Sequence, residues 1–439
     1  MEICVIGAGH VGLVTAACFA ELGHRVICVD RDKSRISGLL KKKMPFYEPG
    51  LKELVVRNLA NKRLRFAAAI AEGVRKGEII FIAVGTPPLP SGDADLTAVE
   101  QVAREIARSM TSYRLVVEKS TVPVETGKWL KKTLALSVPK KVSFDVASNP
   151  EFLREGSAVQ DFLHPDRIVV GVESKRAKKL ITGLYKPFKA PLLVTDIPSA
   201  ELIKHASNAF LATKISFINA IACIAEKVGA DVEQISKGMG MDPRIGPAFL
   251  NAGAGFGGFC FPKDVEAFIR IAEKIGYDFD LLKSVKQINE QQRRNIVKKA
   301  EKQLWNLKGK TIGILGLSFK PNTDDLRFAP ALDIISALLK EGAHVKAHDP
   351  VAVPEARRIL KGVQFCKDPY ELAKGADCLI LMTEWKEYEG LHFQRLKKLM
   401  RQPVLVDGRN MYDPHVIQKA GFRYTSVGRA GSQEDTEES

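Results

Sequence analysis

The sequence predicts an α/β protein made of two Rossmann-like, doubly wound α/β domains joined by a long central helix. Three observations predict this class. Short apolar runs alternate with amphipathic stretches, which is the pattern of βαβ units around a parallel sheet. A glycine-rich turn follows the first apolar run. A second block of alternating runs opens at Lys310, after a long stretch with helical spacing.

The N-terminal block contains the apolar runs that we expect to form the first sheet. They cover residues 3–6, 25–29, 79–84, 115–118, 144–147, 167–172 and 192–195. Several runs end in polar or turn-forming residues, such as Asp30, Thr86 and Thr121. Ligands of open α/β sheets bind outside the carboxyl ends of the strands, so we expect functional residues at these ends.

One long helix is expected from residue 200 to 228, followed by shorter helices at 232–237, 265–274 and 284–304. Residues 253–258 are too rich in glycine for a regular element. The second block has expected strands at 311–315, 345–348, 379–382 and 404–406. We therefore expect a domain at 1–199, a central helical and dimerisation region at 200–304, a C-terminal α/β domain at 305–428 and a disordered acidic tail at 429–439.

Composition excludes several classes of protein. Apolar residues make up 45% and charged residues 27% of the 439 residues, which excludes a disordered chain and a collagen-like fibre. The net charge of +15 permits anionic partners, but no helix-turn-helix and no basic block longer than residues 41–43 is present, so we expect no nucleic acid partner. No apolar stretch approaches the length of a membrane span, and no signal peptide is recognisable, so we expect no membrane association.

The cysteines indicate the compartment. Their number is seven, which is odd, and they form neither a CxxC pair nor a Cys/His pattern with the spacing of metal ligands. We therefore expect no metal site and a reducing, cytoplasmic environment.

The motif Gly7-Ala-Gly9-His-Val-Gly12 follows an expected strand and opens an expected helix. Its first glycine permits a tight turn, the second lets the backbone approach a pyrophosphate, and the third allows close helix packing. Asp30 ends the next strand, where its carboxylate would accept hydrogen bonds from ribose hydroxyls and repel a 2′-phosphate. The motif predicts NAD rather than NADP, although Arg31 and Lys33 weaken that preference.

Cys260 is a candidate nucleophile. It lies in the run Gly257-Gly-Phe-Cys-Phe-Pro-Lys-Asp264, where Lys263 and a following helix N-terminus would lower the pKa of the thiol. The competing interpretation is a small buried hydrophobic residue between two phenylalanines. Other candidates are Lys204 and Asn208, which share a helix face, and the polar residues at strand ends, Thr121 and Glu151.

Five segments resemble the nucleotide-sugar 6-dehydrogenases, in the order and spacing of that family. They are residues 7–12, 148–156 continuing through 161–166, 204–209, 255–264 and 316–327, and the resemblance extends to about Gly428. It implies a four-electron oxidation of a sugar C6 alcohol to a carboxylate with two NAD in succession. It also implies UDP-glucose as the substrate, UDP-glucuronate as the product and a homodimer.

The resemblance implies a role for each matching residue. Cys260 would trap the C6 aldehyde as a thiohemiacetal, Lys204 and Asn208 would stabilise the oxyanion, Asp264 and Thr121 would hold an ordered water, and Glu151 would act as a general acid and base. The cofactor residues implied are Gly7, Gly9, Val11, Gly12, Asp30, Arg35, Thr86, Thr121, Glu155, Lys263 and Arg327. The substrate residues implied are Glu151, Phe152, Leu153, Arg154, Glu155, Lys204, Asn208, Arg244 (across the dimer), Phe249, Asn251, Gly257, Lys320 and Arg409.

Two positions depart from the family pattern, and three alternatives stay open. Phe259 stands where serine is usual, and Phe328 stands where glutamate is common. A GDP-mannose dehydrogenase would use the same chemistry on another sugar nucleotide. A two-electron β-hydroxyacid dehydrogenase would need no reactive cysteine, and an NAD-binding regulator would use the basic charge on nucleic acid.

Overall fold

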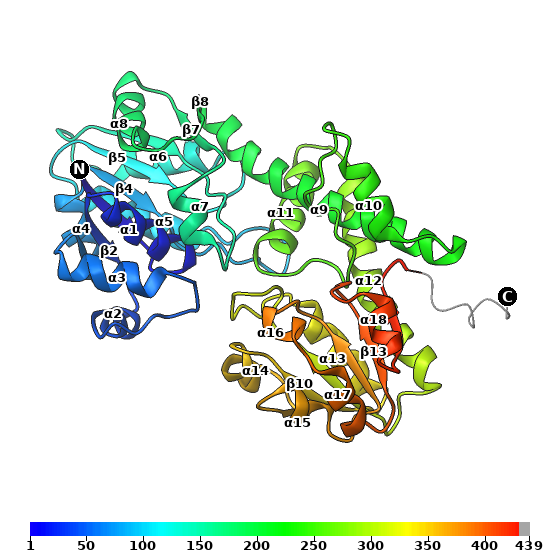
Figure 1. Cartoon of the computed structure of the whole chain (residues 1–439). Helices are drawn as coiled ribbons and strands as arrows, with labels where there is room; N and C mark the ends of the chain where they lie inside the picture. Colours follow the sequence, from blue (N-terminus) through cyan, green and yellow to red (C-terminus); the bar gives the residue numbers. More distant parts are fainter. Residues whose placement is uncertain (430–439) are drawn as a thin grey trace. The chain divides into compact units, whose positions relative to one another are not determined.

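The computed structural model describes residues 1–429 and divides into two units (Figure 1). The first comprises residues 1–207 and 266–277, and the second comprises residues 208–265 and those from 278 onward. Each unit is described by itself. Residues 430–439, which include nearly all of the expected acidic tail, lie outside the described residues.

The first unit is built on an eight-stranded sheet in the order β3-β2-β1-β4-β5-β6-β7-β8. Every pair is parallel except β6 with β7, which is antiparallel. The strands are β1 (Glu2–Ile6), β2 (Arg25–Val29), β3 (Leu64–Ala67), β4 (Ile79–Ile82), β5 (Arg114–Glu118), β6 (Phe144–Ser148), β7 (Ile168–Val172) and β8 (Leu192–Thr195). The first six follow the strand order of a dinucleotide-binding fold.

Helices cover both faces of this sheet because its strands are apolar on both sides. Ile3 and Val5 of β1 join one core, whereas Cys4 and Ile6 join the other. The first core includes residues of α1 (His10–Glu21), α2 (Lys33–Leu40), α3 (Leu51–Ala60), α7 (Ala158–Leu163) and α8 (Lys175–Tyr185). The second includes residues of α4 (Ile70–Lys76), α5 (Thr97–Ser109) and α6 (Thr126–Ser137).

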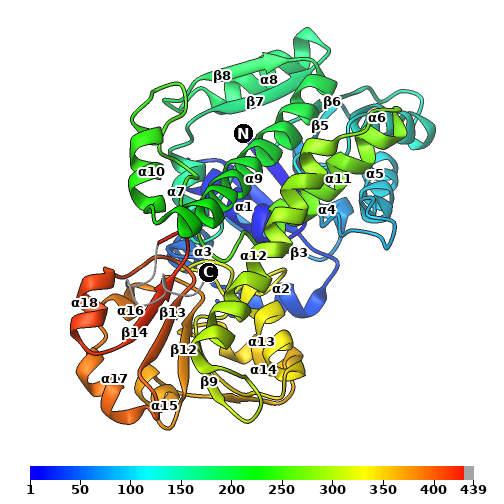
Figure 2. The same ribbon diagram turned by 90° about the vertical axis from the view of Figure 1, so that its right-hand side faces the viewer.

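The second unit contains a parallel sheet in the order β11-β10-β9-β12-β13-β14 (Figure 2). Its strands are β9 (Thr311–Leu315), β10 (His344–His348), β11 (Val363–Phe365), β12 (Cys378–Leu381), β13 (Val404–Asp407) and β14 (Arg423–Ser426). One core includes α12 (Asp280–Leu304), α13 (Pro330–Lys340) and α14 (Val353–Ile359), with Val232 of α10 (Val232–Gly240). The other includes α15 (Pro369–Ala373), α16 (Lys386–Glu389), α17 (Phe393–Leu399) and α18 (Pro414–Lys419). Together with the first sheet, this arrangement confirms the predicted α/β class.

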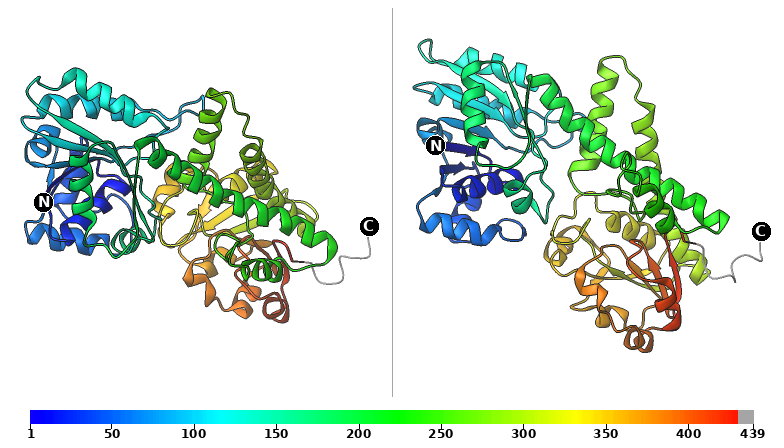
Figure 3. Two further views of the ribbon diagram at one scale, coloured as in Figure 1. Left: turned by 90° about the horizontal axis from the view of Figure 1, so that it is seen from above. Right: turned by 45° about the horizontal axis from the view of Figure 1, so that its top comes forward.

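Two helices run from one unit into the other. They are α9 (Ile197–Val228), drawn in green as one unbroken helix in Figure 3, and α11 (Cys260–Lys274). The expectation that no stretch is long and apolar enough to span a membrane is wrong for α9, since an 18-residue window of it has a mean hydropathy of 1.5. However, 44% of that window is buried inside the protein, and Glu201, Lys204 and His205 are buried on α9. A core helix passes the same test of length and composition.

The structure differs from the sequence prediction at the sheet edges and at one helix start. Strands β3, β11 and β14 were not predicted, because each has exposed positions and therefore lacks a continuous apolar run. Helix α11 begins at Cys260 rather than at 265. Pro262 is tolerated there because the first turn of a helix does not need its missing N–H.

Candidate active site

The glycine motif occupies the turn between β1 and α1. Gly7 has φ +105°, and a Cβ there would lie 2.4 Å from the carbonyl oxygen of Ala83. A Cβ on Gly12 would lie 1.9 Å from the carbonyl oxygen of Gly7, whereas a Cβ on Gly9 would meet nothing within 4 Å. The first and third glycines are therefore needed for packing, and the second leaves open space for a ligand.

Asp30 lies beside this turn and is 7% exposed. Its carboxylate accepts hydrogen bonds from the backbone N–H of Ala8 (2.8 Å) and of Asp32 (2.9 Å), and from Arg35 Nη1 (2.8 Å). A cavity of about 890 Å³ is lined by Gly7, Gly9, Asp30 and Arg35, among others. The open glycine, the aspartate at the strand end and the size of the cavity fit a dinucleotide.

Lys204 and Glu151 form a buried ion pair. Lys204 Nζ lies 3.1 Å from Glu151 Oε1, and both side chains are almost fully shielded from water. Glu151 Oε2 also accepts the N–H of Leu153 at 2.6 Å, and the ring of Phe152 lies 5.4 Å from Nζ. A carboxylate and an ammonium in so dry a place interact strongly with any charge that develops beside them.

The segment after Glu151 is held by charged side chains. Arg154 donates two hydrogen bonds to Asp161, from Nε (3.1 Å) and Nη2 (2.5 Å). Glu48, which sequence reasoning missed, accepts the N–H groups of Gly156 and Ala158, both at 2.8 Å. The backbone of the expected substrate loop is therefore anchored at its end.

A second group of candidates lies at the start of α11 in the second unit. Cys260 is the first residue of this helix and is half-buried. Asp264 accepts a hydrogen bond from Asn208 Nδ2 at 2.6 Å and pairs with Lys263 Nζ at 2.6 Å. Cys260 therefore lies in the first turn of a helix, three residues before this buried Lys–Asp pair.

Burial disfavours the thiolate form of the six cysteines other than Cys260. Burial raises the pKa of the thiols of Cys4, to about 12, and of Cys18, Cys28, Cys223, Cys366 and Cys378. The thiolate is the reactive form, so these six are poor nucleophiles. The functional interpretation of Cys260 therefore depends on its place at the start of α11.

The phenylalanine that replaces a serine before Cys260 has a physical role in this chain. The ring of Phe259 lies 4.2 Å from the Arg327 guanidinium and 5.5 Å from Lys263 Nζ. Cations are attracted to the face of an aromatic ring. The ring of Phe259 therefore attracts two of the expected cofactor residues, Lys263 and Arg327.

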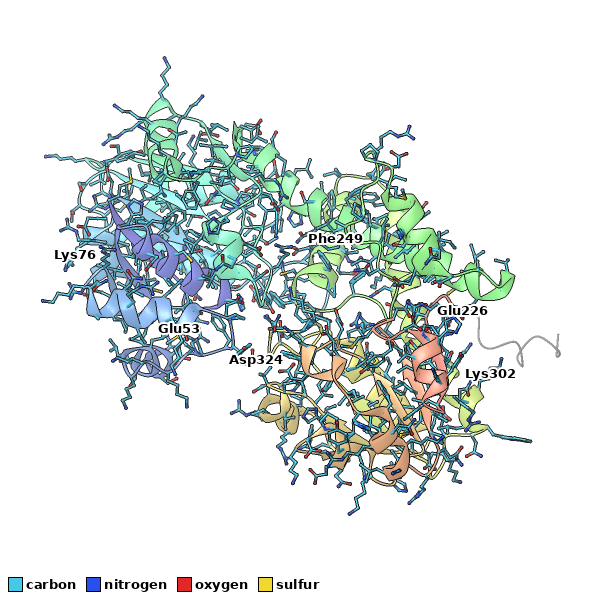
Figure 4. The ribbon with its side chains drawn as sticks, viewed as in Figure 1. Glu53, Lys76, Glu226, Phe249, Lys302 and Asp324 are labelled. Carbon is cyan, nitrogen blue, oxygen red and sulfur yellow. The ribbon has the colours of Figure 1, made fainter. Side chains whose placement is uncertain are left out.

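The remaining substrate candidates of the second unit fall into two sets. Arg409 donates to the carbonyl oxygens of Met382 (2.7 Å), Phe319 (3.2 Å) and Gly255 (3.3 Å), which brings the glycine-rich loop and the segment of Lys320 together. Phe249, labelled in Figure 4, has φ +65° and lies 6.1 Å from the ring of Phe261. In contrast, Arg244 is exposed and binds Asp242.

The structure brings some predicted residues together and leaves others apart. Thr86 Oγ1 donates to the carbonyl oxygen of Thr121 at 2.9 Å, and the Lys204–Glu151 and Asn208–Asp264 pairs form within their own units. Val11, Glu155, Asn251 and Gly257 lie in or beside the loops described above.

Sequence reasoning missed Lys119, which follows the apolar run of β5. Burial lowers the pKa of Lys119 to about 8, and the nearby Glu151 carboxylate raises it. The two charged residues Glu118 and Lys119, directly after the apolar residues of β5, were the signal that could have found it.

Comparisons with known proteins cover the whole of this arrangement. A family model described as the UDP-glucose/GDP-mannose dehydrogenase family, NAD binding domain, matches residues 1–189. The central domain of the same family matches residues 198–291, and its UDP binding domain matches residues 313–414. The NAD-binding model covers the turn and the aspartate described above, which supports NAD as the cofactor.

Individual relatives match over nearly their full length. The UDP-glucose 6-dehydrogenase TuaD of Bacillus subtilis is 49% identical over 429 residues, which cover 98% of this chain and 93% of that protein. The UDP-glucose 6-dehydrogenase of Rhizobium meliloti is 45% identical over 98% of this chain and 100% of that protein. The solved structure of a UDP-glucose dehydrogenase from Pyrobaculum islandicum is 43% identical, with a TM-score of 0.91 and 98% of each chain covered.

Proposed function

We propose a specific reaction for this chain, which belongs to the UDP-glucose/GDP-mannose dehydrogenase family. We infer that it oxidises the C6 alcohol of UDP-glucose to a carboxylate, giving UDP-glucuronate, with NAD as the oxidant. The observation that carries this proposal is Cys260, the one cysteine of the chain that opens a helix beside a buried Lys–Asp pair. A dehydrogenase that stops at the aldehyde has no use for such a thiol.

The first half of the reaction produces the aldehyde. When bound, NAD accepts a hydride from C6 in each of the two oxidations. The Lys204 ammonium stabilises the negative charge that develops on the C6 oxygen, and its burial with Glu151 makes that interaction strong. Asn208 provides a second donor through its amide group, and Glu151 accepts and returns the proton.

The second half needs the thiolate because an aldehyde donates hydride poorly until a nucleophile makes its carbon tetrahedral. Cys260 Sγ bonds to C6 and forms a thiohemiacetal. Loss of the second hydride leaves a thioester, and water then breaks the C–S bond to release the carboxylate and regenerate the thiolate. Asp264, buried with Lys263 and Asn208, accepts a proton from that water, and Thr121 binds it.

Loop residues of each unit are proposed contacts of the sugar nucleotide. Phe152, Leu153 and Glu155 present the backbone that follows Glu151, and Phe249, Asn251 and Gly257 border the glycine-rich loop. Arg154, Lys320 and Arg409 supply positive charge for the diphosphate. Arg35, Thr86 and Arg327 contribute to the cofactor site.

A homodimer through α9 is part of the proposal. Phe210, Phe217 and Ile224 are spaced by seven residues on α9 and are each about half exposed or more. Such an apolar stripe favours pairing with a second copy, which would also supply Arg244. If sedimentation at micromolar protein concentration showed only a monomer of 48.3 kDa, it would contradict the dimer.

We also place the protein in the cytoplasm, because all seven cysteines are outside disulfides.

The decisive experiment measures the ratio of NADH formed to UDP-glucose consumed. Two NADH and one carboxylate per sugar nucleotide are expected, with no aldehyde released. Cys260→Ala should bind both ligands and form no carboxylate. The matched control is Cys223→Ala, which removes another half-buried thiol and should leave the ratio at two.

Two results would overturn parts of the proposal. A ratio of one with a neutral sugar as product would exclude the four-electron reaction, and a ratio of two in Cys260→Ala would remove this cysteine from it. GDP-mannose and UDP-N-acetyl sugars belong in the same assay. A higher kcat/KM for GDP-mannose would favour the alternative member of the family.

A further inference from the structure

The loop that carries Thr121 is held at its start by β5 and β4. It joins β5 to α6 and spans residues 119–125. The N–H of Ser120 donates to Glu118 Oε1 at 2.9 Å, and Ser120 Oγ donates to the carbonyl oxygen of Val84 at 2.8 Å. With the bond from Thr86 to the Thr121 carbonyl oxygen, these contacts fix the second and third residues after β5, Ser120 and Thr121.

The far end of the loop is strained. Glu125 has φ +77°, a left-handed conformation that a residue with a Cβ adopts at a cost of about 1–2 kcal/mol. The next residues enter α6, where backbone N–H groups have no helical partner. A conformation of this kind persists only when neighbouring groups hold it in place.

Helix α9 supplies those groups from a single turn. Glu201 is 2% exposed, and its two carboxylate oxygens accept the N–H of Glu125 and the N–H of Gly127, both at 2.7 Å. One turn later His205 is 1% exposed, and its Nε2 donates to the carbonyl oxygen of Val122 at 2.7 Å. Glu201 and His205 therefore bind the backbone of the loop at two places, His205 at Val122 and Glu201 at Glu125.

Gly127 shows how closely the helix and the loop approach. A Cβ at this position would lie 2.5 Å from Ile197 Cγ2 and 3.2 Å from Glu201 Oε1. The glycine lets α6 start against α9. The contact is therefore built into the backbone of the loop as well as into the two side chains.

We propose that Glu201 and His205 are positioning residues for the reaction, which set the place of Thr121 relative to Lys204. The inference rests on the proposed function, in which Lys204 and Thr121 act on substrate and water. Lys204 lies between Glu201 and His205 in the sequence, so the turn of α9 that carries the ammonium also holds the loop. A displacement of about 1 Å in such a site can cost up to roughly 100-fold in rate.

The competing explanation is that Glu201 only caps α6 and stabilises the fold. A double-mutant cycle separates the two. Glu201→Gln keeps the shape but offers one carbonyl oxygen where two acceptors are needed, and its NH2 group faces a backbone donor. We expect kcat to fall about tenfold while KM for UDP-glucose changes less than about twofold. In a Thr121→Ala background, the same substitution should lower kcat by less than about twofold.

A matched control uses a second buried carboxylate of the same kind. Glu48 is 6% exposed and also accepts two backbone N–H groups, those of Gly156 and Ala158. Glu48→Gln should combine additively with Thr121→Ala, because it holds a different loop. His205→Phe gives an independent arm if Glu201→Gln does not fold, and His205→Gln should restore part of kcat because it keeps an N–H donor.

The outcomes are distinct. Losses from Glu201→Gln or His205→Phe that multiply in full with that of Thr121→Ala would overturn the positioning role while the proposed function stands. An unmutated protein that makes no NADH from UDP-glucose would overturn the proposed function and the positioning role together. Non-additivity confined to Glu201 and His205, with Glu48 additive, is the result we expect.

Discussion

The two sheets share a strand order and a strand-end aspartate, but they use that aspartate differently. Asp30 follows β2 and Asp349 follows β10, the equivalent strand of the second sheet. Each accepts the backbone N–H of the second residue after its central strand, Ala8 or Leu317, at 2.8 Å. Gly7 and Gly316 both have positive φ at the turn.

The difference lies in the remaining acceptor positions. Asp349 also accepts from Ser318, from the N–H groups of Val351 and Ala352 at the start of a helix, and from Trp385 Nε1 at 3.1 Å. Besides Ala8 N–H, Asp30 accepts from the N–H of Asp32 and from the half-exposed Arg35, and it borders a large cavity. Two similar turns therefore differ in whether their aspartate has capacity left for a ligand, which the strand order alone does not decide.

The largest expected effect is on stability in the second sheet. Asp349→Ala would leave several buried donors without an acceptor, so we expect the free energy of unfolding to fall by about 3–5 kcal/mol. Asp30→Ala should cost about 1–2 kcal/mol, since fewer buried groups lose a partner. Urea unfolding of the two variants checks this. Equal losses would show that the two aspartates do the same structural work.

The second prediction concerns cofactor choice. Asp30→Ala removes the carboxylate that repels a 2′-phosphate, and it leaves Arg31 and Arg35 to attract one. We expect the ratio of kcat/KM for NAD to that for NADP to fall by about 10- to 100-fold. The role of Asp30 in cofactor choice would be contradicted if the unmutated protein used both cofactors equally. It would also be contradicted if Asp349→Ala changed the ratio by a similar amount.

A third prediction uses the carboxylates at the next equivalent strand ends, Glu118 of β5 and Asp407 of β13. Burial raises the pKa of Glu118 to about 8 from an ordinary value near 4.5. Between these values the folded protein retains a proton that the unfolded chain has lost, so stability falls as pH rises from about 4.5 to 8. Glu118→Gln should flatten this fall and be more stable than the unmutated protein at pH 8.

Asp407 provides the contrast for this titration. Burial also raises its pKa, but its carboxylate accepts the N–H groups of Arg409 and Tyr412 and the hydroxyl of Tyr424, which lower it. Asp407→Asn should therefore lose stability at every pH, because two acceptors are replaced by one. Thermal melts at several pH values distinguish the two variants. A Glu118→Gln protein with an unchanged slope would contradict the assignment.

The smallest expected effect tests the indole of Trp385. Trp385→Phe keeps an aromatic ring in the core but removes the donor to Asp349, so we expect a loss of about 1 kcal/mol. NADH formation should be unchanged. If Trp385→Phe lowered the free energy of unfolding as much as Asp349→Ala does, the hydrogen bond from the indole would account for most of the stabilisation by Asp349.

The sequence predicted the inner strands of both sheets because most of them are rich in apolar residues, although β10 is mixed. It predicted the turn at Gly7–Gly12 because glycines at this spacing after a strand are typical of a dinucleotide-binding turn. The edge strands β3, β11 and β14 escaped prediction, since half-exposed strands carry mixed residues. The predicted start of α11 at residue 265 was five residues too late, since the helix begins at Cys260. The division at 199/200 and 304/305 stays a prediction beside the two units of the structure.

The candidate residues divide in the same way. Motif spacing identified Gly9 and Asp30, because a glycine-rich turn followed by an acidic strand end is a sequence pattern, whereas the roles expected of Lys204 and Cys260 came from the resemblance to a known family. Only the tertiary structure showed that Glu201 and Glu48 hold loops far away in the chain, through bonds that span 74 and 76 residues for Glu201 and 108 and 110 residues for Glu48. The sequence by itself determined the fold class and predicted the NAD turn and the thiol, whereas the tertiary structure decided which buried acceptors are already occupied. The reason is physical: apolar periodicity and turn geometry are local properties of the chain, but the partner of a buried carboxylate is set by folding.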